Sequence, residues 1–197
     1  MKKRHSIPLS ITLSSAAVIP THAAELSLKI QLPEITTGQY VRPYVAVWLE
    51  KADGSFVKSL TLWHEMKDKR GNPVVNDKYL KSLREWWSKS GASADMKFDS
   101  ISSATRPAGQ HELLFTPGKE PLDNLAPGNY QLMVEVAREI KAPRTFNGGD
   151  KPVKNGKDSS SVEASPALSF TWPVKQATTV AVNGKNELAE VALSIKP

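Results

Sequence analysis

Period-two alternation of apolar and polar residues is the feature that most limits what this chain can fold into. In the segment 24–33, Leu or Ile occupies every second position from 26 to 32, and polar residues lie between them. Because successive side chains of a strand point to opposite faces, this pattern predicts a strand with one buried face. Within the run 56–63, Leu60 and Leu62 are expected to share one face in the same way. Further strands are predicted at residues 44–49, 110–115, 130–136, 165–172, 178–182 and 188–195.

Turn signals separate the predicted strands. Asp53-Gly54 and Asn183-Gly184 each lie between two such runs, as in a β-hairpin. The stretch LAPGNY at residues 125–130 leads from a turn into a strand and resembles the tyrosine corner of immunoglobulin-like sandwiches. Many short strands at this spacing are typical of two packed sheets. We therefore expect a mainly β fold, an immunoglobulin-like β-sandwich with one inserted amphipathic helix.

The inserted helix is predicted at about residues 77–89. Its apolar residues recur at helical spacing: Tyr79, Leu80, Leu83, Trp86 and Trp87. Asn76 or Asp77 can cap its start, and Gly91 can end it. The adjacent Trp residues are consistent with a ligand platform, but packing in the core is the favoured interpretation.

A long polar stretch follows the strand at residues 130–136. Residues 142–161 are rich in Gly, Lys, Asn and Ser, and they predict a mobile loop. We expect residues 24–197 to form a single β-sandwich domain that contains both the helix and this loop.

Residues 1–23 have the three-part pattern of a signal peptide. Three basic residues at positions 2–4 precede a moderately apolar run at residues 7–20. Small residues place the cleavage after Ala23, with Ala24 as the alternative. The run is too short and too polar to span a bilayer, and no later run is long or apolar enough. We expect an exported, periplasmic protein that does not span the membrane.

The net charge and the composition limit which partners, covalent links and metal sites the chain is expected to have. The formal net charge is +6, and it falls to +3 when the three basic residues of the leader are removed, which does not favour nucleic acid as a partner. The chain contains no Cys, which excludes disulfides and a Cys nucleophile. Only His64 and His111 follow the leader, so a His-rich metal site is not predicted.

Motifs of serine hydrolases, zinc proteases and phosphate-binding loops do not occur, and we predict no catalytic residues. An enzyme assembled from scattered residues stays an alternative.

One short motif suggests a modified hydroxyl. Residues 99–105, DSISSAT, resemble the acceptor motif of FAD:protein FMN transferases. That motif runs Asp, two variable positions, Ser or Thr, Gly or Ser, Ala and the acceptor Thr. The chain fills these positions with Asp99, Ser102, Ser103, Ala104 and, as the acceptor, Thr105. Gly is commoner than Ser at the position of Ser103. The resemblance implies FMN bound covalently through its phosphate to Thr105.

The residues around the motif suit this chemistry. Small side chains let an enzyme grip the segment, and Pro107 and Gly109 keep it out of a helix and at the surface. Asp99 is expected to orient the segment or to help hold a metal-bound transfer complex. Arg106 and backbone N–H groups are expected to contact the phosphodiester. A polar turn that leads into a strand is the alternative interpretation.

A second resemblance covers about half of the chain, from about Tyr40 to Glu139. The matching stretches are YVAVWLE at 44–50, LTLW at 60–63, SATRPAG at 103–109, PGNY at 127–130 and VEVARE at 134–139. Together they resemble a family of exported bacterial proteins named domain of unknown function 2271 (DUF2271). Members commonly occur with PepSY-type membrane proteins and FMN transferases. The stretch Ile140–Lys157 departs from the family pattern and looks like an insertion.

The two resemblances lead to one hypothesis. They imply a periplasmic flavoprotein that carries FMN on Thr105 and transfers electrons as a partner of a PepSY-type membrane reductase or another periplasmic redox protein. The protein would be a carrier or accessory and no stand-alone enzyme. A cofactor-free binding or assembly module of the periplasm is the alternative, since the fold alone does not choose between them. Arg138 and Glu139 either face the motif or form a solvated pair.

Overall fold

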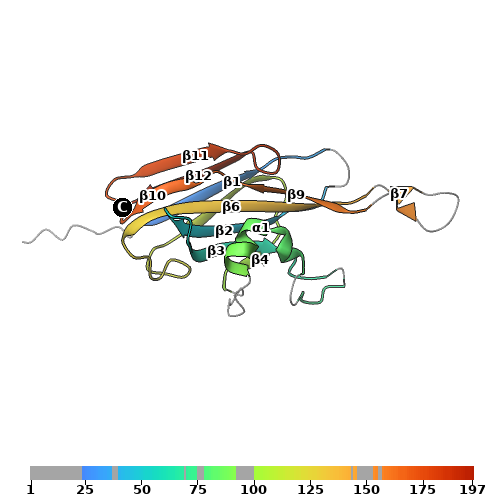
Figure 1. Cartoon of the computed structure of the whole chain (residues 1–197), viewed down its shortest axis with the longest axis horizontal. Helices are drawn as coiled ribbons and strands as arrows, with labels where there is room; N and C mark the ends of the chain where they lie inside the picture. The colour runs from blue at the N-terminus through green and yellow to red at the C-terminus, as the bar shows by residue number, and fades with distance from the viewer. Residues whose placement is uncertain are drawn as a thin grey trace, which may run out of the picture.

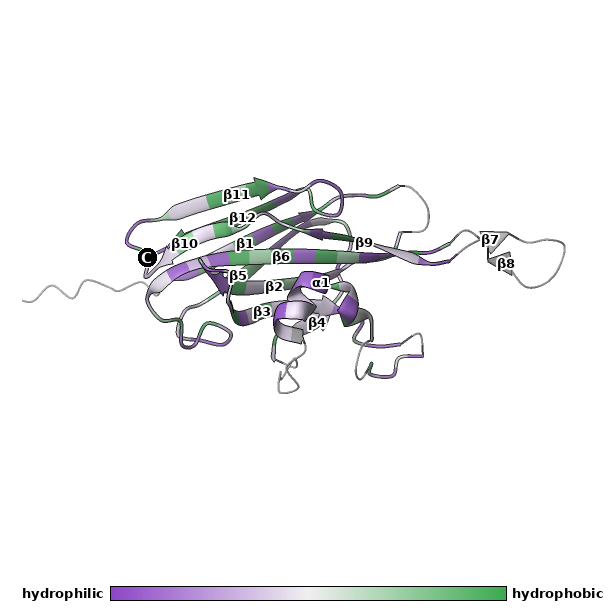
Figure 2. Ribbon diagram, viewed as in Figure 1, coloured by the Kyte–Doolittle hydropathy of each residue, from purple (hydrophilic) through white to green (hydrophobic). Residues whose placement is uncertain are grey.

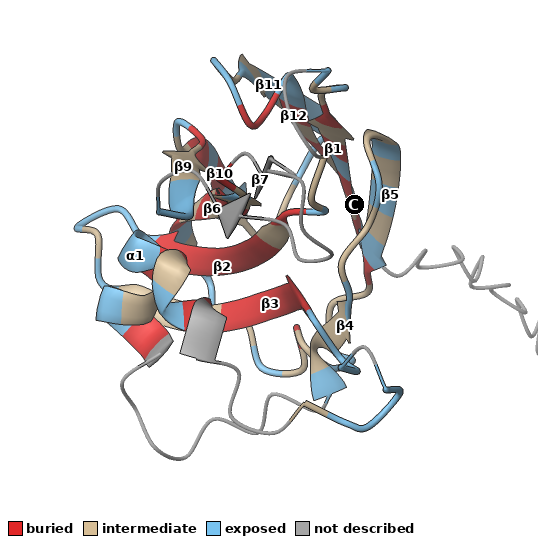
Figure 3. Ribbon diagram, turned by 90° about the vertical axis from the view of Figure 1, so that its right-hand side faces the viewer, coloured by how far each residue is buried: buried red, intermediate tan, exposed pale blue. Residues whose placement is uncertain are grey.

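Two β-sheets pack face to face, and a short helical segment covers the outer face of one of them (Figure 1 and Figure 3). The mainly β prediction is confirmed, whereas an immunoglobulin-like strand order stays a prediction. The predicted leader, residues 1–23, lies outside the described part of the chain. This computed structural model describes residues 24–36, 40–68, 70–74, 78–91, 100–142, 144–145, 153–154 and 157–197.

The strands confirm most of the predicted runs. In chain order they are β1 (Glu25–Leu32), β2 (Tyr44–Lys51), β3 (Phe56–His64), β4 (Ser102–Ala104), β5 (Gly109–Phe115), β6 (Gly128–Ile140), β7 (Arg144–Thr145), β8 (Val153–Lys154), β9 (Ser159–Ala164), β10 (Leu168–Trp172), β11 (Thr178–Asn183) and β12 (Glu190–Lys196). Three short helical pieces lie between β3 and β4: the 3₁₀ helix η1 (Lys78–Ser82), the α-helix α1 (Arg84–Trp86) and the π-helix η2 (Trp87–Gly91).

The strands form two main sheets. Sheet A has the order β11-β12-β1-β5, and sheet B has the order β10-β6-β2-β3-β4. Strand β9 also pairs with β6, beyond the end of β10, and β7 pairs with β8 in a separate hairpin. The pair β3–β4 is parallel, and the other pairs are antiparallel. Parallel neighbours need a crossover connection, and the helical segment at residues 78–91 lies within it.

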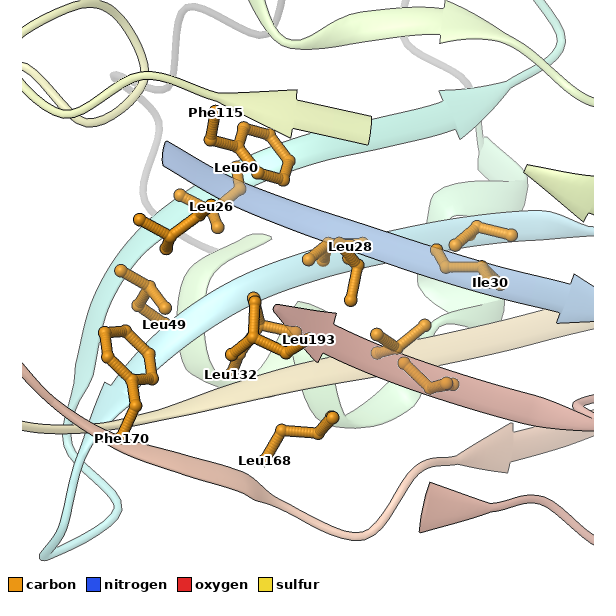
Figure 4. Close-up of a cluster of buried hydrophobic side chains, with 14 of the residues drawn as sticks. Leu26, Leu28, Ile30, Leu49, Leu60, Phe115, Leu132, Leu168, Phe170 and Leu193 are labelled. Atoms are coloured by element: carbon orange, nitrogen blue, oxygen red, sulfur yellow. The ribbon is translucent and has the colours of Figure 1, made fainter. Parts of the chain in front are cut away.

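The main core lies between the two sheets. Apolar side chains from β1, β2, β6, β10 and β12 point toward one another there (Figure 4). The alternation predicted for β1 is confirmed, since its four apolar residues are at most 1% exposed. Burial of each such Leu or Ile side chain contributes about 1.5–3 kcal/mol. The sequence pattern of β1 therefore describes a strand whose other face is open to solvent.

A second apolar cluster lies on the opposite face of sheet B, under the helical segment. Its buried members are Ala46, Trp48, Leu62, Leu80, Leu83, Trp86 and Ala137. Because this cluster covers one face of β2 and the main core covers the other, residues 45–50 are all buried (Figure 3). This explains why β2 is a continuous apolar run without alternation.

The helical segment differs in form from the single helix predicted at residues 77–89. It is broken into three pieces, and it ends at Gly91 as predicted. The predicted caps Asn76 and Asp77 lie outside the described residues. The exposed residues of the segment are hydrophilic (Figure 2). No helix in the described ranges is both long and apolar enough to cross a membrane.

A carboxylate from sheet B holds the start of α1. Glu135 on β6 is 1% exposed and accepts hydrogen bonds from the backbone N–H groups of Glu85 (3.1 Å) and Trp86 (2.9 Å). The indole N–H of Trp86 donates to Ser59 Oγ at 2.9 Å. The two hydrogen bonds to Glu135 satisfy backbone donors that a helix start leaves unpaired. Packing and hydrogen bonds to sheet B therefore stabilise a segment whose helical pieces are too short to be stable alone.

The prediction that Leu60 and Leu62 share one face is wrong. The register of β2 and β3 shifts after Val47, and the shift leaves Leu60 without a paired residue. Leu60 therefore packs in the main core, and Leu62 packs under the helical segment. An extra residue in one strand of a pair turns the following side chains to the other face.

The prediction of a loop over residues 142–161 is wrong at its end. Strand β9 begins at Ser159, and the short strands β7 and β8 also fall in this range. The Glu163 carboxylate on β9 accepts hydrogen bonds from the backbone N–H groups of residues 185–188 at 2.5–3.3 Å. Because β9 is polar, its sequence did not predict a strand. The structure pairs it with β6 in sheet B, and Glu163 joins it by hydrogen bonds to the loop between β11 and β12.

Two predicted turns are present. Tyr130 donates its hydroxyl proton to the Ala126 carbonyl at 2.7 Å, as the tyrosine of a tyrosine corner does. Gly184 opens the β11–β12 connection, where a Cβ atom would lie 2.1 Å from the Leu188 carbonyl oxygen. Only glycine fits that approach.

Candidate functional site

The predicted acceptor segment forms an edge of sheet B. Strand β4 contains Ser102, Ser103 and Ala104, and Thr105 follows it directly. β4 is the last strand in the sheet order, so its far side carries no paired strand among the described residues. Ala104 is exposed, and Thr105 is half-buried. Asp99, the first residue of the predicted motif, lies outside the described part of the chain.

Hydrogen bonds hold this segment against β3. Leu62 donates its N–H to the Ile101 carbonyl at 2.9 Å, and Thr105 donates its N–H to the His64 carbonyl at 3.2 Å. The His64 ring nitrogen Nε2 lies 3.2 Å from Ser102 Oγ. The Thr105 hydroxyl has no hydrogen-bond partner among the described residues. Thr105 is thus fixed through its backbone while its hydroxyl stays available.

Thr105 lies on the wall of a cavity of about 710 Å³. The cavity is lined by residues from strands β2 and β6, from the start of β9, from the helical segment and from the positions just after β3 and β4. Its lining residues are Val41, Arg42, Tyr44, Glu65, Ser82, Thr105, Ala137, Arg138, Glu139, Lys141, Asp158, Ser159 and Ser160. Its volume is within the range of about 300–1,000 Å³ that is common for small-molecule pockets.

Among the described residues that line this cavity, three are cations, and two of these are paired. Arg138 binds Glu187 through Nε (2.8 Å) and Nη2 (2.9 Å), and both side chains are buried. Lys141 pairs with Glu139. Arg42 is exposed and has no carboxylate partner within the described ranges. Arg42 is therefore the cation best placed to receive an anionic group.

The cavity lining includes an aromatic residue and a small residue from neighbouring strands. Tyr44 on β2 is paired in register with Ala137 on β6. Tyr44 is half-buried and packs against the cluster under the helical segment, to which Ala137 also belongs. Both residues line the cavity, and Ala137 contributes only a methyl group to it.

Tyr40 connects the chain before β2 to the turn after the acceptor segment. Burial raises the pKa of its phenol, although the charge of Arg138 and a hydrogen bond with the backbone of Ala108 act in the opposite direction. The residues before β2 and the turn that follows Thr105 therefore lie close together.

Arg106, the predicted phosphodiester contact, lies elsewhere. Its guanidinium carbon is 4.4 Å from the centre of the Trp63 ring, a cation–π contact, and it does not line the cavity with Thr105. His111 meets the same ring edge-on at 5.4 Å. Trp63 is fully buried, and within the described ranges its indole N–H has no hydrogen-bond partner.

The Trp residues belong to the packing of the molecule, as the favoured interpretation predicts for the pair Trp86-Trp87. Three are fully buried, namely Trp48, Trp63 and Trp86. Trp87 and Trp172 are half-buried and pack against the two apolar clusters. None of the five is among the residues that line the cavity.

The structure also tests the expectation for Arg138 and Glu139. Both line the same cavity as Thr105, and each pairs with another residue, so a mutual solvated pair is ruled out. Sequence reasoning did not identify Arg42 or Tyr44 as site residues. A basic residue two positions before a buried strand is a weak signal for Arg42, and nothing local distinguishes Tyr44 from a core residue.

Comparison with known proteins gives one match. The model of the DUF2271 family, described as a predicted periplasmic protein, matches residues 25–190. No curated protein and no solved structure matches the chain.

Proposed function

The chain belongs to the DUF2271 family of predicted periplasmic proteins, and from this premise we propose that it is a periplasmic electron carrier that holds FMN covalently on Thr105. The observation that carries the proposal is the position of Thr105. Its hydroxyl has no partner among the described residues, it directly follows the edge strand β4, and it lies on the wall of a cavity of about 710 Å³.

The edge position of β4 suits recognition by a transferase. An enzyme that modifies a hydroxyl must bind the segment around it in an extended form, and exposed edge strands are often recognised by addition of a further strand. The small side chains of Ser103 and Ala104 leave room for this contact. In the transfer, Thr105 Oγ1 bonds to the FMN phosphorus of FAD, the pyrophosphate bond breaks, AMP leaves and the hydroxyl proton is released.

The residues beside Thr105 fit the product of this reaction. A phosphodiester carries one negative charge, and Arg42, Arg138 and Lys141 line the same cavity. Arg42 is the contact that we assign to the phosphodiester, because the other two cations already have carboxylate partners. The attached flavin would supply the redox chemistry, and the protein would supply its position and surroundings.

The proposed partners follow from the resemblance to the family. An FAD:protein FMN transferase would modify Thr105, and a PepSY-type membrane protein or another periplasmic redox protein would exchange electrons with the flavin. Covalent attachment suits an exported carrier, because a dissociating cofactor would be lost by dilution.

The intact mass of the exported protein tests the proposal. After co-expression with an FMN transferase, we expect a gain equal to FMN less one water on the peptide that contains Thr105. Thr105→Ala should abolish this gain, and Ser103→Ala, the matched control on the neighbouring hydroxyl, should keep it. An unmodified wild-type chain, beside a known acceptor modified by the same transferase, would refute the proposal.

A further inference from the structure

Among the described residues that line the cavity beside Thr105, Tyr44 is the one with an aromatic ring. The Trp residues are held in the two apolar clusters, and three of them are fully buried. Tyr44 differs from them because it packs against a cluster on one side and lines the cavity on the other. It is the aromatic side chain that a molecule in this cavity would meet.

We infer, on the basis of the proposed function, that the isoalloxazine ring of FMN attached to Thr105 lies in this cavity against the Tyr44 ring. Tyr44 is then a flavin-positioning residue. The lining supports this placement, since Ala137, the register partner of Tyr44, also lines the cavity and carries only a methyl group. Offset stacking of aromatic rings stabilises such an arrangement.

The elements around the cavity favour a ring that reaches inward from Thr105. Thr105 follows β4 at the edge of the sheet, and Tyr44 is on β2, with β3 between these strands. Ser82 of the helical segment and Ser160 of β9 also line the cavity. The phosphodiester would then stay near the edge of the sheet, and the ring would lie over β2 and β6.

Two half-buried aromatic residues allow a matched comparison. Tyr44 and Trp87 pack against the same apolar cluster, and only Tyr44 lines the cavity. Substitution of either by Leu removes an aromatic ring from the same part of the core. A general loss of packing would affect both variants, whereas loss of a flavin contact would affect only Tyr44→Leu.

The experiment is time-resolved flavin fluorescence on the exported, FMN-loaded full chain, with the covalent FMN confirmed by intact mass in each sample. A stacked flavin is quenched and decays rapidly, so the amplitudes report the ratio of stacked to open flavin. Tyr44→Leu should lower this ratio by about two- to twelvefold, the factor that corresponds to about 0.5–1.5 kcal/mol for an aromatic pair. Trp87→Leu should leave it unchanged.

Quenching by acrylamide in the wild-type protein tests the inference without any variant. Ligand pockets cover about 70–90% of the surface of a bound molecule, so the quenching constant should be at least about threefold lower than for free FMN. If FMN is attached but Tyr44→Leu keeps the wild-type ratio and acrylamide quenches as in free FMN, the inference is overturned and the proposed function stands. If the wild-type chain gains no FMN, both fall.

Discussion

At the scale of single residues, the pair Arg138–Glu187 connects the cavity to the other sheet. Arg138 on β6 and Glu187 in the β11–β12 connection are 8% and 3% exposed in their side chains, and two hydrogen bonds join them. A buried charge is tolerated only when a partner of opposite sign is in contact with it. The pair therefore fixes Arg138 in place, and its loss would leave an uncompensated cation beside the cavity.

We expect Glu187→Ala to lower the free energy of unfolding by about 3–5 kcal/mol, because it leaves the Arg138 guanidinium buried and unpaired. Urea denaturation measures the change. Glu139→Ala is the matched control, since it breaks the half-exposed pair with Lys141 and should cost less than about 1 kcal/mol. Equal losses in the two variants would contradict the role assigned to the buried pair.

At the scale of elements, the helical segment depends on sheet B for its position. Burial is the main influence on Glu135 and raises the pKa of its carboxyl, although the N–H groups of Trp86 and Glu85 act in the opposite direction. The Glu135 carboxylate stabilises the helical segment, because those two backbone donors would otherwise be buried without partners.

We expect Glu135→Ala to destabilise the fold by about 2–4 kcal/mol, because two backbone donors of the helical segment lose their acceptor. Glu135→Gln keeps one acceptor oxygen and should lose less. Urea unfolding followed by Trp fluorescence measures both, since the backbone N–H of Trp86 is one of the two donors in this contact. The assignment fails if Gln and Ala at this position are equally destabilising.

At the scale of the whole molecule, Glu163 joins the two sheets across the edge of the sandwich. Partial burial opposes ionisation of this carboxyl, but the backbone N–H groups of Asn186, Lys185, Glu187 and Leu188 together outweigh it and lower its pKa below 4.5. The ionised group thus binds the β11–β12 connection to β9, next to the residues that hold Arg138.

A carboxyl whose pKa is lowered by folding contributes stability that is present above its unfolded pKa and is lost as the pH falls through its folded pKa. We therefore expect the wild type to be more stable than Glu163→Gln at pH 7, and the difference to shrink as the pH falls below 4.5. Thermal or urea unfolding across pH 3–7 measures it. A difference that grows on acidification would contradict the assignment.

Period-two alternation was sufficient to predict β1 and β6, because the sequence of a strand with one buried face shows which side chains are buried. The same reasoning failed at Leu60, where a shift in register with β2 changes the face of the side chain. It also failed at β9, whose polar residues are held in a strand by pairing with β6. In both places the deciding partner is distant in the sequence.

The candidate site also has a part that the sequence predicts and a part that depends on contacts between distant segments. The chain by itself determined the small, polar segment around Thr105 and the turn after it, because these depend on neighbouring residues. Only the tertiary structure decided that Arg42, Tyr44 and Arg138 line one cavity with Thr105, and that Arg106 lies over Trp63 instead. The physical reason is that a cavity is made by sheet order and register, which depend on contacts between segments far apart in the chain.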